Sequence, residues 1–117
     1  MSRLQANENP IVLKTFSFAV NAARYCQILQ KNKDFPLANQ LFKSSTSIGA
    51  NTREAQNAES KKDFVHKMKV AAKECDETDY WLSLCKEAKN YPEPEELIEN
   101  VLSINRVLSK IISSSKE

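Results

Sequence analysis

Few residues of this chain have the types and spacing that acid–base or nucleophilic catalysis needs. His66 is the single histidine, and Asp63 lies three residues before it, but no nucleophilic side chain has a matching helical offset. Glu54 and Glu74 could form a pair of carboxylates, although acids in helical bundles also hydrogen-bond neighbouring helices. The sequence therefore predicts no catalytic residues and no enzymatic activity.

Cysteine and acidic side chains could bind a metal ion, but their pattern does not favour it. Cys75 and Asp79 are four residues apart on a predicted helix. Cys26 or Cys85 could complete such a site, yet the three cysteines include no CxxC pair. A di-metal bundle would need a Glu-x-x-His motif on each of two helices, which a single histidine excludes. We therefore expect free structural thiols, no metal and no cofactor, in a protein of the reducing cytoplasm.

A cluster of lysines could bind phosphate groups, although a solvated helix paired with its neighbours explains the same cluster at least as well. From 61 to 73 five lysines are offset by a single acid, and from 74 to 79 four acids follow. This order opposes the helix macrodipole, which favours acids early and bases late, so helix stability does not explain it. A basic surface of this kind could contact RNA or DNA phosphates. The predicted nucleic-acid-binding residues are Lys14, Arg24, Lys61, Lys62, Lys67, Lys69 and Lys73.

An alternative explanation of the lysine cluster stays open. A solvated helix whose charges pair with those of neighbouring helices would carry the same pattern. The sequence pI of about 8.4 is also below the strongly basic range that is typical of dedicated nucleic-acid-binding domains.

The length and composition indicate a single globular domain. The 117 residues are 41% hydrophobic and 27% charged, with a net charge of +2, as in ordinary folded domains. One glycine is too few for a glycine-rich phosphate loop or a hairpin-rich fold. No apolar run approaches the roughly 18 residues of a membrane span, and the N-terminal residues lack the apolar core of a signal peptide. We therefore expect one domain over residues 1–117 and no membrane partner.

Prolines and a capping serine divide the chain into four helical segments. Pro10 and Pro36 can each begin a helix, and Pro92 and Pro94 interrupt one. Ser60 resembles the first residue of a capping box. The predicted helices cover about residues 10–30, 36–57, 60–89 and 95–113, with short disordered tails at both ends of the chain.

In three of these segments, apolar residues repeat with alternating spacings of four and three. The line of the third segment consists of Phe64, Met68, Ala71, Cys75, Thr78, Leu82 and Cys85. That of the fourth consists of Leu97, Val101, Ile104, Leu108 and Ile111, and that of the first of Val12, Phe16, Ala19, Ala23 and Cys26. A repeat near 3.5 residues predicts shallow, left-handed helix packing. Because 30 residues of helix are about 45 Å long, we predict an all-α fold, an elongated, antiparallel, up-down-up-down four-helix bundle.

The second segment is the least regular of the four. Residues 44–52 are mostly poor helix formers and contain Gly49, so the helix could break there. The apolar residues around them nevertheless keep helical spacing: Leu37, Leu41, Ile48 and Ala55. We predict a continuous helix whose small residues pack closely against a neighbour.

The first segment carries a second apolar line in addition to its predicted core line. A bundle helix buries one stripe, so the second line must be covered by something else or stay exposed as ordinary surface hydrophobes. Trp81 likewise lies off the main line of the third segment. We predict self-association of the chain, with an interface formed by Ile11, Phe18, Ala22, Tyr25, Leu29 and Trp81.

Three stretches of the chain resemble one known family. They are residues 40–55, QLFKSSTSIGANTREA, residues 60–64, SKKDF, and residues 71–78, AAKECDET. The family is that of the "four helix bundle proteins", whose members were first noticed as proteins encoded in intervening sequences of bacterial 23S rRNA genes. The positions that match the family pattern, and that the resemblance marks as structural, are Gln40, Ser47, Asn51, Glu54, Phe64 and Glu74.

The resemblance implies an antiparallel four-helix bundle that assembles into a ring-shaped homopentamer. A related branch contains the accessory proteins of diversity-generating retroelements, which bind a reverse transcriptase and nucleic acid through a basic surface. The expected function is that of a non-enzymatic homo-oligomer that contacts RNA or DNA. The alternative is a protein-interaction scaffold or accessory subunit that engages a partner protein and binds no nucleic acid. Within the motif, we expect Asn51 to hydrogen-bond a facing helix and Glu54 to reach a base or a backbone amide.

Overall fold

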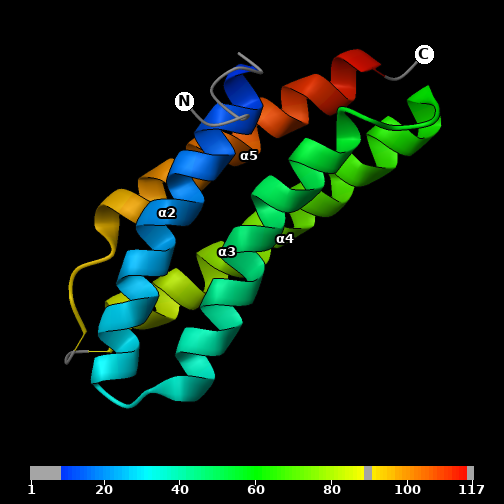
Figure 1. Ribbon diagram of the computed structural model, residues 1–117. Helices are drawn as coiled ribbons and strands as arrows, with labels where there is room; N and C mark the ends of the chain where they lie inside the picture. The colour runs from blue at the N-terminus through cyan, green and yellow to red at the C-terminus, as the bar shows by residue number, and fades with distance from the viewer. Residues whose placement is uncertain (1–8, 89–90, 116–117) are drawn as a thin grey trace.

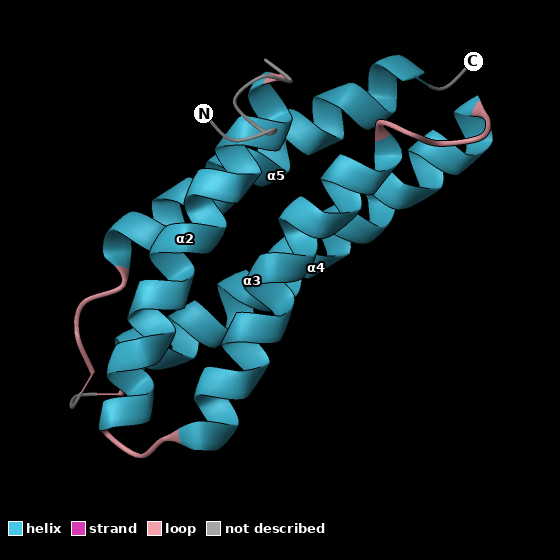
Figure 2. Cartoon of the chain, viewed as in Figure 1, coloured by secondary structure: helices cyan, strands magenta, loops and turns pink. Residues whose placement is uncertain are grey.

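The computed structural model describes residues 9–88 and 91–115, and four α-helices account for most of them. Helix α2 covers Pro10–Lys31, α3 covers Phe35–Ala55, α4 covers Lys61–Glu87 and α5 covers Glu95–Ser115. Figure 2 shows these helices joined by short loops, and the described residues contain no strand. The observed bounds lie within two residues of the predicted ones. The predicted end at residue 89 and the tails at 1–8 and 116–117 lie outside the described residues.

The four helices run antiparallel in up-down-up-down order, as predicted (Figure 1). Helix α3 packs against α2 and α4, whereas α5 packs against α4 and, less extensively, against α2. The molecule measures 46 × 32 × 21 Å, and its radius of gyration of 14.6 Å exceeds the roughly 13 Å of a compact domain of this length. One end of the bundle, called here the α3–α4 end, holds the α3–α4 turn, the start of α2 and the end of α5 (Figure 1). No described helix has the length and apolar character that crossing a bilayer requires.

Side chains that accept hydrogen bonds from free backbone N–H groups begin three of the helices. Asn9 accepts a 3.1 Å bond in the first turn of α2, and Asp34 accepts one of 3.4 Å in that of α3. Ser60 accepts a 3.0 Å bond from the N–H of Asp63, whose carboxylate accepts one of 3.2 Å from the N–H of Glu59. The capping box predicted before α4 is therefore present, with one difference. The Asp63 carboxylate bonds the N–H of Glu59 rather than that of the capping residue Ser60.

Helices α4 and α5 bury the lines that their spacing predicts. The buried residues of α4 are Met68, Ala71, Cys75, Thr78, Leu82 and Cys85, and those of α5 are Leu97, Val101, Ile104 and Leu108. Phe64 and Ile111, at the ends of these lines, are partly buried against the same core. Periodicity alone therefore placed these two helices correctly.

Helix α2 faces the core chiefly with the apolar line predicted to contact another copy, and Val12 and Cys26 of the predicted core line are buried beside it. Its buried line keeps alternating spacings of four and three and consists of Ile11, Thr15, Phe18, Ala22, Tyr25 and Leu29. Phe16, from the predicted core line, is 48% exposed, whereas Phe18 is 2% exposed. The predicted oligomer interface of Ile11, Phe18, Ala22, Tyr25 and Leu29 is therefore wrong, because these residues fill the core of one chain.

Thr15 is the polar residue at the centre of the buried line of α2, and it makes that line look interrupted in the sequence. The Thr15 hydroxyl donates a 2.9 Å hydrogen bond to the carbonyl of Ile11 in the preceding turn, so its burial leaves no unsatisfied polar group. The polar residue type therefore imposes little cost at this core position.

Helix α3 continues through Gly49 without a break, as predicted. A Cβ atom at Gly49 would stand 3.4 Å from the carbonyl oxygen of Thr15, so the missing side chain lets α2 and α3 approach closely. The buried hydroxyls of this region are also paired. Ser44 Oγ donates to the carbonyl of Leu41 at 3.3 Å, and Thr78 Oγ1 of α4 donates to Ser44 Oγ at 2.9 Å.

Candidate nucleic-acid interface

Four side chains that can donate to an anion form a straight ridge along the outer face of α4. Lys62, His66, Lys69 and Lys73 follow one another at intervals of four, three and four residues, and all four are exposed. This spacing places them on one side of the helix, opposite the buried line that includes Met68. At 1.5 Å per residue, this α4 basic ridge is about 16 Å long.

The lysines of the α4 basic ridge are available to a ligand. Among the described residues, no carboxylate lies within ion-pair distance of Lys62, Lys69 or Lys73. Lys67, by contrast, lies on the flank that faces α3, where its Nζ pairs with Glu54 Oε1 at 3.5 Å. Lys61 is the first residue of α4. The structure thus brings three of the five predicted α4 lysines into one row.

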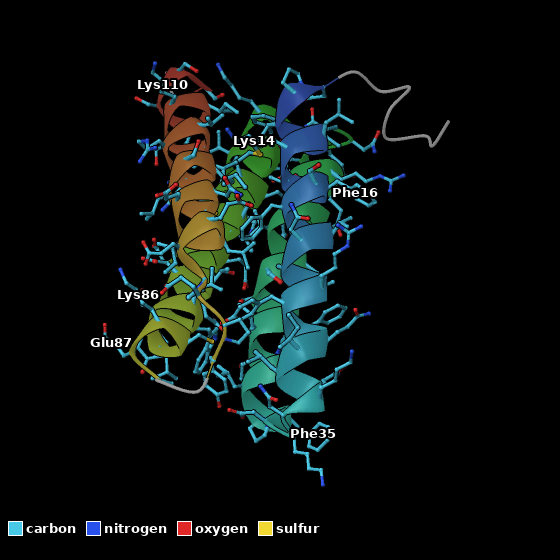
Figure 3. All side chains as sticks on the ribbon, turned by 90° about the vertical axis from the view of Figure 1, so that its left-hand side faces the viewer. Lys14, Phe16, Phe35, Lys86, Glu87 and Lys110 are labelled. Atoms are coloured by element: carbon cyan, nitrogen blue, oxygen red, sulfur yellow. The ribbon has the colours of Figure 1, made fainter. Side chains whose placement is uncertain are left out.

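The two predicted residues on α2 lie apart from the ridge. Lys14 Nζ donates a 3.0 Å hydrogen bond to Ser103 Oγ of α5, toward the α3–α4 end of the bundle (Figure 3). Arg24 lies about 15 Å further along α2, where its guanidinium donates to Asn21 Oδ1 at 3.5 Å. Because α2 does not pack against α4, neither side chain can share a short ligand with the ridge.

The antiparallel order of the helices adds two cations that are not among the predicted binding residues. Arg106 and Lys110 are exposed on the second half of α5, which runs beside the first half of α4. Figure 3 places Lys110 at the α3–α4 end of the bundle. The sequence could have indicated Arg106 and Lys110, because the end of the fourth helix of an antiparallel bundle must lie beside the start of the third.

The opposite end of the bundle is acidic. Asp76 and Glu77 follow the ridge on α4, and α5 begins with two glutamates. At this end Lys86 Nζ pairs with Glu95 Oε1 at 2.6 Å, and this hydrogen bond raises the pKa of Lys86 (Figure 3). The acids of the second half of α4 would repel an anion, so the part of this helix suited to an anionic ligand is its first half.

The α4 basic ridge has the chemistry of a surface that binds phosphate without reading bases. Ammonium and imidazole groups donate hydrogen bonds to phosphate oxygens, which position a nucleic acid but carry no sequence information. On this described face of α4 the first aromatic side chain is Tyr80, which lies beyond the acids. Surfaces that bind single strands place aromatic side chains among their cations so that bases can stack. The geometry therefore favours a duplex backbone over unpaired bases.

The motif residues of α3 gather on the flank of that helix that faces α4. The Glu54–Lys67 ion pair agrees with the expectation that Glu54 reaches a base. The expectation for Asn51 is wrong, because its Nδ2 donates to the carbonyl of Ser47 in its own helix at 2.9 Å. Gln40 is exposed on the same flank. These polar groups therefore line the α3–α4 seam rather than the bundle interior.

Two further motif residues come from α4. Phe64 is partly buried against the core. Glu74 is half-buried at the seam, where burial and then the nearby Glu77 raise the pKa of its carboxyl, while Lys43 and Lys73 oppose this shift. The indole of Trp81 is also half-buried, and its Nε1 donates to Glu77 Oε2 at 3.1 Å. A role of Trp81 in an interface stays a prediction.

The three cysteines are buried and free. Burial raises the pKa of Cys26 to about 11 and that of Cys75 to about 12, so neither forms a thiolate at neutral pH. Within the described part of the chain, no three histidine, cysteine or acidic side chains are arranged to hold a metal ion. The thiols therefore serve as small apolar core residues.

The chain is similar to known proteins in sequence and in fold. Residues 7–114 match the family described as 23S rRNA-intervening sequence protein. A protein of unknown function from the S23 ribosomal protein family of Bacteroides thetaiotaomicron, solved by crystallography at 1.70 Å resolution, is 36% identical. It superimposes with a TM-score of 0.82, covering 87% of this chain and 97% of that protein. A search of the curated proteins found no match.

Proposed function

The chain belongs to the 23S rRNA-intervening sequence protein family, and from this premise we propose that it binds the phosphate backbone of duplex nucleic acid along the α4 basic ridge. We propose further that it is a non-enzymatic, self-associating protein of the cytoplasm. The family name links its members to 23S rRNA genes, so double-stranded RNA is the first ligand to test.

The observation that carries this proposal is the row formed by Lys62, His66, Lys69 and Lys73 on the exposed side of one helix. A DNA duplex carries one phosphate charge per roughly 1.7 Å of its axis, so the 16 Å length of the ridge spans about nine of them. The four side chains of the ridge therefore have more phosphate groups within their span than they can bind. The protein can bind at any position along the duplex. Arg106 and Lys110 at the same end extend the positive potential to α5.

The test is a titration of a fluorescein-labelled RNA duplex of about 20 base pairs, followed by anisotropy between roughly 50 and 200 mM KCl. The ridge variant carries Lys62→Gln, Lys69→Gln and Lys73→Gln. Each phosphate contact contributes about 0.9 to the slope of log K against log salt, so the variant should lose about 2.7 of that slope. A DNA duplex of the same sequence should behave alike, because backbone contacts do not read bases.

The matched control removes the same charge from the acidic end, through Lys31→Gln, Lys33→Gln and Lys86→Gln. It should keep the wild-type slope, although its net charge equals that of the ridge variant. Equal losses in both variants would show that only net charge matters and would refute a site on α4. Failure of the wild-type chain to bind at about 50 mM salt would remove the nucleic-acid function altogether.

The alternative function, a protein-interaction scaffold or accessory subunit, predicts that no form of the chain binds either duplex. The exposed side chains of Phe16 on α2 and of Phe35 and Phe42 on α3 favour some protein contact. The ring of five subunits implied by the family resemblance stays a prediction, and it needs an interface other than the buried α2 line.

A further inference from the structure

The seam between α2 and α5 contains a groove that reaches the core of the bundle. Of the helix pairs in contact, α2 and α5 pack least extensively, and the groove between them has a volume of about 390 Å³. Sites for small molecules commonly measure roughly 300–1,000 Å³. The apolar residues that line the groove are Leu13, Phe18 and Ile104, and the last two belong to the buried core. A ligand in this α2–α5 groove would therefore rest on apolar side chains.

Three uncharged polar side chains line the same groove from both helices. Ser17 and Asn21 come from α2, and Asn100 comes from α5. No described residue hydrogen-bonds the hydroxyl of Ser17 or the amide of Asn100. Asn21 accepts from Arg24 through its Oδ1 atom, which leaves the Nδ2 group of Asn21 as a donor. The groove therefore offers hydrogen-bonding groups that a polar ligand can use.

Lys14 gives the α2–α5 groove a positive charge at one end. It is the one charged residue among the described residues that line the groove, and no described carboxylate lies within ion-pair distance of it. Its Nζ donates to the neutral Ser103 Oγ at 3.0 Å, so its charge is not compensated. Figure 3 shows Lys14 between the two helices, and its bond to Ser103 bridges the seam. Asn21 lies about 10 Å further along α2, toward the acidic end of the bundle.

From these observations we propose that the α2–α5 groove binds a small organic carboxylate. The carboxylate accepts a hydrogen bond from Lys14 Nζ, and the apolar body of the ligand lies on Phe18 and Ile104. A hydroxyl or amide group at the far end of the ligand bonds the asparagine side chains. This site goes beyond the proposed function, because neither α2 nor α5 contributes to the α4 basic ridge.

Charge and size distinguish this ligand from other anions. One ammonium group matches the single negative charge of a carboxylate, whereas a phosphate monoester carries between about 1.5 and 2 charges at neutral pH. An inorganic anion would make no use of the apolar lining. The Lys14–Ser103 bridge closes one end of the groove, so a ligand of about 10 Å fits better than a helix or strand that must continue past that end.

The test is a titration of the ¹⁵N-labelled full chain at pH 7, followed by two-dimensional NMR. The probe is 4-hydroxyphenylpropanoate, which has a carboxylate at one end of an apolar body and a hydroxyl group at the other. The amide signals of α2 and α5 residues beside the groove should shift and saturate with a Kd of about 1 mM, the affinity expected for about twelve non-hydrogen atoms. The uncharged 4-hydroxyphenylpropanamide has the same size and should bind about tenfold more weakly.

Three variants locate the site. Lys14→Gln should weaken binding of the carboxylate about tenfold, because the hydrogen bond from a charged group is lost. Lys31→Gln is the matched control, since it removes the same charge from the same helix outside the groove, and it should keep the wild-type Kd. Ser17→Phe places a ring in the groove from an exposed position. It should abolish the saturable shifts and retain the helical circular dichroism of the wild type.

Several results would overturn the proposal. They are the absence of saturable shifts up to about 10 mM probe, equal affinity for the carboxylate and the amide, and equal losses in Lys14→Gln and Lys31→Gln. Shifts that spread over lysines on every helix would likewise show unspecific attraction of the anion. The ridge variant should bind the probe as the wild type does, so failure to bind duplexes and failure to bind the carboxylate are separate outcomes.

Discussion

The buried hydrogen bond between Thr78 of α4 and Ser44 of α3 allows a quantitative test of how the two helices are held together. Both hydroxyls are 0% exposed, and Thr78 Oγ1 donates to Ser44 Oγ at 2.9 Å. Thr78→Val preserves shape and removes the donor, whereas Ser44→Ala removes the acceptor. The two changes and their combination form a double-mutant cycle around one contact.

The expected size of each effect follows from what the remaining hydroxyl can do. In Thr78→Val, Ser44 still donates to the carbonyl of Leu41 at 3.3 Å but receives no donor. In Ser44→Ala, the Thr78 hydroxyl can turn to its own helix, as that of Thr52 does in bonding to Ile48 at 2.8 Å. Each single change should therefore lower the free energy of unfolding by about 1 kcal/mol, and the double variant by about 1 rather than 2.

Urea unfolding followed by circular dichroism at one fixed protein concentration would measure these free energies. A loss of about 1 kcal/mol corresponds to a decrease of about 4 °C in melting temperature for a chain of this length. The urea dependence of the free energy should be the same in all four proteins. Additivity of the two single effects within about 0.3 kcal/mol would refute the reasoning, because it would mean that the hydroxyls do not interact.

Two further outcomes test the core of α2. In urea unfolding, Phe18→Ala should lower the free energy of unfolding by about 3–5 kcal/mol, because its ring is buried. Phe16→Ala should lower it by less than about 1 kcal/mol, because Phe16 is half-exposed. Equal losses in the two variants would contradict the observed orientation of α2. Stability should also decline as pH rises above 10, in part because burial, and then Cys85, raise the pKa of Tyr25 in the folded chain, so the unfolded chain loses this proton first. The buried thiols of Cys26 and Cys75, whose pKa is also raised, add to the decline. Tyr25→Phe should flatten that decline in thermal melts, and an equally steep decline in the variant would exclude Tyr25 as its cause.

Part of the candidate site was readable from the chain. The excess of lysines at the start of α4 is visible in the sequence. The intervals between Lys62, Lys69 and Lys73 place these three residues on one side of a helix. Which lysines stay available depended on neighbours that only the fold supplies. Lys67 is paired because Glu54 of α3 lies opposite it. Arg106 joins the same end because α5 runs antiparallel to α4.

The amino-acid sequence by itself determined the four helices, their starts at Pro10 and Ser60, and the core faces of α4 and α5. These features depend on local hydrogen bonds and on a single apolar stripe, which each segment contains within itself. The rotation of α2 was decided by tertiary structure, because this helix carries two apolar stripes. Only the contact of Thr15 with Gly49 on α3 shows which stripe can approach closely enough to be buried. Phe16 therefore lies on the outside of the bundle, whereas Val12 and Cys26 of the same stripe are buried at the edge of the core.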